Sequence, residues 1–141
     1  MKIIVISEGK QGNGGLVAEE MMDIVKEDGR EAHIYSVENT KPEEMEEGEF
    51  YVFVSPTHFG GPHRKMKKLI ENGVFPKKAG YGLITLSKKQ KRTTADKLEE
   101  LLVKRGLAKE VPSLHILENK DGTLRDFREP LLKFYHNIKK H

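Results

Sequence analysis

Along this chain, short apolar runs alternate with segments in which apolar residues recur at helical spacing. The runs predict five strands, at residues 3–6, 31–37, 50–54, 81–86 and 114–117. The spaced segments predict helices whose ends are marked by Asp28-Gly29, Asn72-Gly73 and Gly106, and a terminal helix that starts near Asp126.

A short acidic helix is predicted between the second and third strands, because Thr40 and Glu43 have the spacing of a capping box and Pro42 falls in the first turn. Strands and helices then alternate along the whole chain, with no internal repeat and no low-complexity linker. This order is typical of a parallel sheet covered on both faces. We therefore expect a single α/β domain over residues 1–141, a three-layer doubly wound five-stranded parallel sheet of order 2-1-3-4-5.

The segment that follows the first strand, SEGKQGNGG at residues 7–15 (the first loop), is rich in glycine and leads into a helix. Such a loop places unpaired backbone N–H groups at a helix N-terminus, where an anion is favoured. We interpret it as a phosphate site formed by Gly9, Lys10, Gln11, Gly12, Asn13 and Gly14. The alternative is that its glycines only make a tight turn between strand and helix.

The segment that follows the third strand, SPTHFGGP at residues 55–62 (the second loop), suits a flat heterocycle. It offers two rings for stacking and glycines that allow close approach of the backbone. The candidate binding residues are Pro56, Thr57, His58, Phe59, Gly60 and Gly61. In the alternative interpretation, Phe59 packs into the domain and His58 is an exposed loop residue.

The two loops follow the first and third strands. In a sheet of order 2-1-3-4-5 the strand order reverses between these two strands, and ligands bind beyond the carboxyl ends at that point. The two loops are therefore expected to form one site for a nucleotide with a planar ring.

Composition limits the other classes of function. The absence of cysteine excludes disulfides and thiolate metal sites, and the six histidines lack ligand spacing, so no metal site is expected. No apolar run is long enough to span a membrane or to form a signal peptide, and we expect a cytoplasmic protein without a membrane partner. No recognised motif supports binding to nucleic acid.

Charge is distributed unevenly along the chain. Residues 1–49 carry five Lys or Arg and thirteen Asp or Glu, a balance of −8, whereas residues 50–141 carry twenty and nine, a balance of +11, which sum to the net charge of +3. If the two parts are also separated in space, the domain has a large dipole that orients charged partners. The alternative is that Lys and Glu only solvate the helix faces.

The second loop, with Lys65-Met66-Lys67 after it, resembles the flavin-ring loop of the flavodoxin-like family, including its quinone-reductase branch. The resemblance covers the whole chain. It implies that the ligand is FMN, with its phosphate in the first loop and its isoalloxazine ring between the second loop and the loop after the fourth strand, where Ser87, Lys88 and Lys89 lie. It also implies that His58 or Phe59 stacks on the ring, and that the Gly60-Gly61 peptide rotates toward N5–H of the reduced flavin.

Two departures from the family pattern concern the loops. The first loop has Gly9, Gln11 and Gly14 where the family usually has three hydroxyl residues, and each missing hydrogen bond costs about 1 kcal/mol or more. The loop after the fourth strand, residues 87–93 (the third loop), has four cations and no aromatic residue, where electron carriers of the family have an acidic rim. Cations there favour the anionic hydroquinone, and they can also bind the phosphates of a nicotinamide nucleotide or an acidic protein.

These features predict an FMN-binding protein that exchanges electrons with a redox partner protein. We favour such a carrier over a small FMN-dependent NAD(P)H oxidoreductase, because no nicotinamide-binding fingerprint is present. The flavin supplies the redox chemistry, and no catalytic acid, base or nucleophile is assigned. The alternative from another class is a binding or regulatory module with the same fold and no flavin.

Overall fold

A computed structural model describes residues 1–9, 12–57, 63–89 and 92–140. Its elements follow the order β1 (Lys2–Ser7), α1 (Gly12–Glu27), β2 (Glu31–Ser36), the 3₁₀ turn η1 (Pro42–Glu44), β3 (Phe50–Pro56), α2 (Arg64–Asn72), β4 (Gly80–Ser87), α3 (Thr93–Lys104), β5 (Ala108–Lys109), β6 (Leu114–Leu117) and α4 (Arg128–Lys139). The strands pair in parallel in the order β2-β1-β3-β4-β5, and β6 also pairs with β4. The predicted doubly wound sheet of order 2-1-3-4-5 is confirmed.

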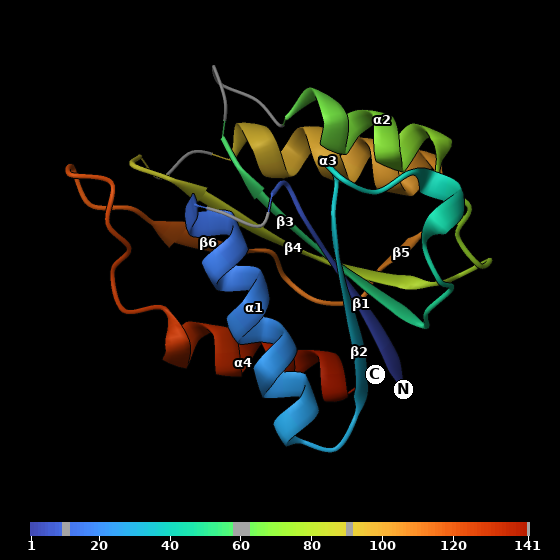
Figure 1. The fold of residues 1–141 in the computed structure, drawn as a ribbon, viewed down its shortest axis with the longest axis horizontal. Coiled ribbons are helices and arrows are strands. Elements are labelled where there is room, and N and C mark those ends of the chain that lie inside the picture. The colour runs from blue at the N-terminus through green and yellow to red at the C-terminus, as the bar shows by residue number, and fades with distance from the viewer. Residues whose placement is uncertain (10–11, 58–62, 90–91, 141) are drawn as a thin grey trace.

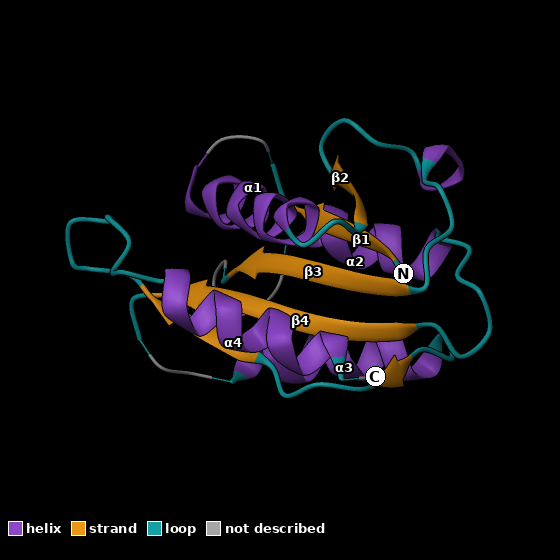
Figure 2. Ribbon diagram, turned by 90° about the horizontal axis from the view of Figure 1, so that it is seen from below, coloured by secondary structure: helices purple, strands orange, loops and turns teal. Residues whose placement is uncertain are grey.

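The sheet lies between two pairs of helices, with α2 and α3 on one face and α1 and α4 on the other (Figure 1). Alternate residues of the central strands separate into two cores. Ile3 and Val5 pack with α1 and α4, whereas Ile4 and Ile6 pack with α2 and α3. Figure 2, turned by 90° from this view, shows β3 and β4 running side by side through the middle of the domain. Because both faces are covered, β1, β3 and β4 are buried at consecutive positions rather than at every second one.

The fifth strand position is divided into two pieces, only one of which the sequence predicted. Gly80 pairs with Ala108, and Ile84 pairs with Leu114, so four steps along β4 match six steps along the neighbouring strand. The two additional residues form a bulge between β5 and β6. Val111 in this bulge is buried in the core on the side of α1 and α4.

The prediction of a short acidic helix between the second and third strands is wrong, because this segment forms only the three-residue turn η1. The hydrogen bond of the capping box forms one residue later than predicted, from the Lys41 N–H to the Glu44 carboxylate at 3.2 Å. The segment is rich in glutamate, and Met45 is its one partly buried apolar side chain after the turn. A helix here has no apolar face to bury, and a short isolated helix is not stable in water.

The two differently charged parts of the chain are in contact with each other. Residues 1–49 form β1, α1, β2 and η1, but β1 pairs with β3, and α4 of the basic part packs on α1 and forms ion pairs with Glu20 and Asp28. The charge dipole suggested by the sequence stays a prediction. In the part of the chain that the structure describes, no helix combines the length and apolar character that a membrane crossing needs.

The packing of α4 on β4 depends on the absence of a side chain at Gly82. A Cβ atom there would lie 2.7 Å from Cζ of Phe134 and 2.9 Å from Cγ2 of Val111. Gly82→Ala should lower the free energy of unfolding by about 1–3 kcal/mol, the usual cost of overpacking. Urea unfolding followed by circular dichroism measures this loss. The double variant with Gly82→Ala and Phe134→Leu should lose less free energy of unfolding than the two single variants lose together. Strictly additive losses would contradict this account of the contact.

Candidate functional site

The three predicted loops begin at the same edge of the sheet, because parallel strands place their carboxyl ends together. Two contacts join the second loop to its neighbours. A Cβ atom on Gly14 of the first loop would lie 3.3 Å from Cγ of Pro56, and the Thr57 N–H donates to the Leu86 carbonyl of β4 at 2.9 Å. The predicted adjacency of the first and second loops is therefore present in the structure, and the third loop follows directly from β4.

The first loop is bordered by carboxylates. The Ser7 hydroxyl donates to the Gly9 carbonyl at 3.1 Å, and a Cβ atom on Gly9 would lie 3.1 Å from Oε2 of Glu38. A hydroxyl-bearing residue at position 9 would therefore require Glu38 to move. The Glu8 side chain, which is 14% exposed, lies with Oε1 3.7 Å from Nε2 of His63. Lys10 and Gln11, the predicted phosphate contacts between these residues and α1, lie outside the described residues.

A third carboxylate reaches this loop from the far end of the chain. The Asn13 side-chain amide donates to Oε2 of Glu118 at 2.5 Å and to the Gly122 carbonyl at 2.8 Å. Asn13 was predicted as a phosphate contact, and in the structure its amide binds the segment at 118–124, orange in Figure 1. Gly12 has a φ of +82°, and a Cβ atom on it would meet nothing within 4 Å. The loop thus has space for a ligand, but the nearby carboxylates oppose a phosphate dianion.

At the second loop, the described residues are Ser55, Pro56 and Thr57. The Thr57 hydroxyl lies 2.8 Å from the buried Thr94 hydroxyl of α3. Two hydroxyl groups carry two protons, and only one can lie between them. When Thr94 donates to Thr57, the O–H of Thr57, which is the half-buried partner, is left to donate to a ligand. The predicted ring contacts His58, Phe59, Gly60 and Gly61 lie outside the described residues.

In the third loop, Lys88 and Lys89 are exposed and Ser87 is half-buried. The Ser87 hydroxyl donates to the Lys89 carbonyl, so it stabilises the loop itself. The charge of Lys88 contributes to the lowered pKa of Asp121, after hydrogen bonds from Thr123, so the third loop and the segment at 118–124 are neighbours.

The sequence analysis missed the polar residues of the fifth strand. His115 lies 2.7 Å from the Thr85 hydroxyl through Nδ1 and 3.0 Å from the Ser87 hydroxyl through Nε2. Burial lowers its pKa, while a hydrogen bond with the Lys89 backbone and the charge of Glu118 act in the opposite direction. A histidine inside the apolar run LHIL of a predicted strand was the available signal.

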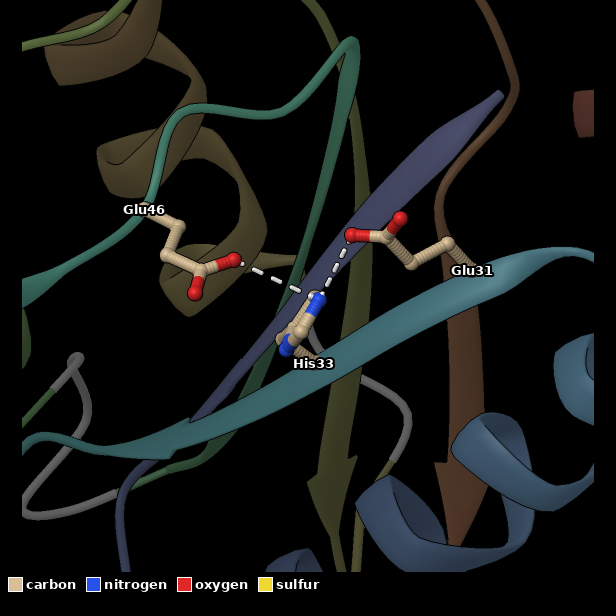
Figure 3. A group of neighbouring side chains, drawn as sticks. All are labelled: Glu31, His33 and Glu46. Carbon is tan, nitrogen blue, oxygen red and sulfur yellow. Dashed lines mark hydrogen bonds and ion pairs between the residues drawn. The ribbon is translucent and has the colours of Figure 1, made fainter.

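A separate cluster lies at the amino end of the strands, away from the loops. Nε2 of His33 is 2.7 Å from Oε2 of Glu31 and 3.3 Å from Oε2 of Glu46 (Figure 3). Within the described residues these three side chains have the spacing of a metal site, with ligand atoms within 4.8 Å of one another. Nζ of Lys2 lies 2.7 Å from Oε2 of Glu46 and 3.5 Å from Oε2 of Glu31. Lys2 therefore already supplies a cation to the two carboxylates.

The pKa directions agree with an ion-pair network in this cluster. The hydrogen bond with His33 is the largest cause of the lowered pKa of Glu31, and the hydrogen bond with Lys2 is the largest cause of the lowered pKa of Glu46. The pKa of Lys2 is raised, mainly by its hydrogen bond with Glu46.

An open cavity of about 450 Å³ at the same end has Lys2, Glu47, Glu49, Lys77 and Lys78 among its lining residues. Its mixed charges do not point to one ligand, and the expected absence of a metal site stays a prediction.

No protein-family model matches this sequence, and a search of curated proteins finds no significant match. Solved structures do match it. Flavodoxin 1 from Bacillus cereus has a TM-score of 0.79 at 15% identity and covers 100% of this chain and 99% of its own. A cysteine-to-alanine mutant of flavodoxin from Pseudomonas aeruginosa has a TM-score of 0.75 at 19% identity, with 99% of both chains covered.

The flavoenzyme FerB from Paracoccus denitrificans, an NAD(P)H:(acceptor) oxidoreductase, has a TM-score of 0.73 at 13% identity and covers 99% of this chain and 98% of its own. At these identities the likeness concerns the fold. Together with the strand order and the four α-helices among the described residues, it shows that the chain has the flavodoxin-like fold.

Proposed function

We propose that this protein binds FMN beyond the carboxyl ends of β1, β3 and β4 and exchanges electrons with a redox partner protein. The observation that carries the proposal is the convergence of the loops, in which Gly14 approaches Pro56 and Thr57 hydrogen-bonds to the end of β4. Flavodoxins and a flavoenzyme among the structural neighbours support a flavin as the ligand. The bound flavin would supply the redox chemistry, and the chain would bind and orient it.

Different residues would hold the two ends of the ligand. At the ring end, the Thr57–Thr94 pair would donate its remaining O–H, and His58 or Phe59 would provide the stacking surface. At the phosphate end, the open space at Gly12 would admit the group, and backbone N–H groups with Lys10 would bind it. The neighbouring carboxylates would make this the weaker end.

Exposed cations surround the proposed ring site. We use the name basic rim for the cations of α2 and of the third loop that are exposed in the structure: Arg64, Lys65, Lys67, Lys68, Lys88, Lys89 and Arg92. The helices α2 and α3, which follow the second and third loops, lie side by side on the same face of the sheet (Figure 1). This arrangement favours a partner protein with an acidic surface, because opposite charges speed the encounter.

A second candidate is an FMN-dependent NAD(P)H oxidoreductase, in which the basic rim binds the phosphates of a nicotinamide nucleotide. The structural likeness to FerB favours it. The binding module without flavin is favoured by the carboxylates at the first loop. Both alternatives are outcomes of the experiments below.

Titration of FMN with the purified protein, followed by quenching of flavin fluorescence, tests the first part of the proposal. We expect saturable quenching at one FMN per chain. Gly14→Ser restores one hydroxyl worth about 1 kcal/mol and should raise the affinity by up to about fivefold, provided that Pro56, 3.3 Å from the added Cβ atom, shifts by a few tenths of an ångström. Leu16→Ser, at an exposed position of the same helix, is the matched control and should have no effect. Saturating FMN that stays unquenched would reject flavin binding and support the module without flavin.

Salt dependence tests the role of the basic rim. Reduction of the FMN-loaded protein by an acidic one-electron donor, such as a plant-type ferredoxin, should slow by about tenfold or more between low salt and about 0.5 M, because screening removes long-range attraction. A basic protein such as mitochondrial cytochrome c, used as acceptor, should show the opposite trend. Combined Lys67→Glu and Lys88→Glu changes should slow the ferredoxin reaction, whereas Lys133→Glu on α4 should not.

The same preparations distinguish the carrier from the reductase. A carrier should not oxidise NADH or NADPH in the absence of a partner protein. Steady turnover of either nucleotide, with a KM that rises in the Lys67→Glu and Lys88→Glu variant, would favour the oxidoreductase. Electron-transfer rates that respond to neither salt nor charge reversal would leave the lysines as solvated surface.

A further inference from the structure

His115 connects the fifth strand to the start of the third loop. It lies opposite Thr85 in the pairing of β6 with β4, and its two ring nitrogens contact Thr85 and Ser87, which share one face of β4. Ser87 in turn donates to the Lys89 carbonyl. One imidazole ring therefore joins two strands and the first turn of the loop.

Counting donors and acceptors determines which ring nitrogen carries the proton. The single proton of the Ser87 hydroxyl is used toward Lys89, so Ser87 presents a lone pair to Nε2. Nε2 must therefore donate, and Nδ1 of the neutral ring must accept the proton of the Thr85 hydroxyl at 2.7 Å.

The surroundings favour the neutral ring. Burial lowers the pKa of His115, whose Nδ1 lies against the buried hydroxyl of Thr85. The carboxylate of Glu118 acts in the opposite direction from the loop after β6. Among the described residues, further charged groups of this region are Lys88 and Lys89, which are exposed in the third loop, Asp121, which lies near Lys88, and Arg92, whose guanidinium is 3.5 Å from the Ser113 hydroxyl.

We propose that neutral His115, in its Nε2–H tautomer, is the positioning residue of the third loop. Its Nε2–H and the Ser87 hydroxyl fix the backbone of residues 87–89, and Ser87, which has only a lone pair to offer the ring, fixes the tautomer. The loop has no aromatic side chain to stack on a flavin, so its backbone orientation decides which N–H and C=O groups face the ligand. The expected effect on ligand affinity rests on the proposed function. The donor and acceptor roles around His115 can be tested in the protein without ligand.

Nuclear magnetic resonance of the ligand-free protein tests the donor and acceptor roles around His115. The ¹⁵N shifts should show His115 neutral at about pH 7 with its proton on Nε2. Thr85→Val, which keeps the side-chain shape, removes the partner of Nδ1 and should leave the proton on Nε2, because the Ser87 hydroxyl can only accept from the ring. A charged ring at the same pH, or a proton on Nδ1, would overturn the proposal.

Two substitutions of His115 test the positioning role. His115→Gln keeps an N–H donor near the place of Nε2, whereas His115→Leu removes it. The backbone amide signals of residues 87–89 should shift or broaden in the Leu variant and stay close to wild type in the Gln variant, with no ligand present. Unchanged signals in both variants would reject the positioning role.

FMN titration of the same variants tests the consequence for the ligand. FMN affinity should fall about tenfold in the Leu variant and less than about threefold in the Gln variant. The affinity of the wild-type protein should also weaken as the pH falls through the pKa of His115, whereas the affinity of the Gln variant should show no such step. If wild-type protein does not bind FMN, the proposed function fails and the amide signals alone judge His115. If FMN binds equally to all three proteins, the proposed function stands and His115 does not position the loop for this ligand.

Discussion

The constraint on which the structure depends is parallel pairing of strands that are buried on both faces. Parallel strands require crossover helices, and these helices must cover both sides of the sheet to bury residues such as Val52 and Phe53. The same geometry brings the carboxyl ends of β1, β3, β4 and β6 to one edge. Loops that are far apart in the sequence therefore meet there, and the candidate site follows from the packing of the core.

The sequence predicted most of this architecture because its signals are local. Apolar runs located the core strands, and Gly29 and Gly106 marked helix ends where φ is +78° and +86°, values that favour glycine. The two failures have a common cause. The helix expected at Pro42–Glu44 had good caps and no apolar face, and β5 is two residues long, too short for any periodicity. Caps do not stabilise a helix without burial, and a short strand depends on its neighbour.

The candidate site was predictable in its location and not in its side-chain partners. Strand order placed the first and second loops together, because ligand position follows from topology. The partners depend on register and loop path: Asn13 binds Glu118, 105 residues away, and Thr57 binds Thr94, 37 residues away. His115 meets Thr85 only because the two-residue bulge sets the register of β6 against β4. Such pairs leave no periodic trace in one sequence.

The charges at the two ends of the candidate site are opposite, and this difference has a thermodynamic consequence for the proposed complex with FMN. The carboxylates of Glu38 and Glu118 border the first loop, while Lys88 and Lys89 border the proposed ring site. The phosphate charge is the same in both redox states, so the first loop weakens the oxidised and the reduced complex alike. The ring gains negative charge on reduction, so the third loop strengthens the reduced complex more. A protein that binds the reduced form more tightly raises the potential of its cofactor by the difference in binding free energy. If FMN binds as proposed, the same arrangement would combine modest affinity with a cofactor that is easier to reduce, which would suit an acceptor of electrons better than a strongly reducing donor.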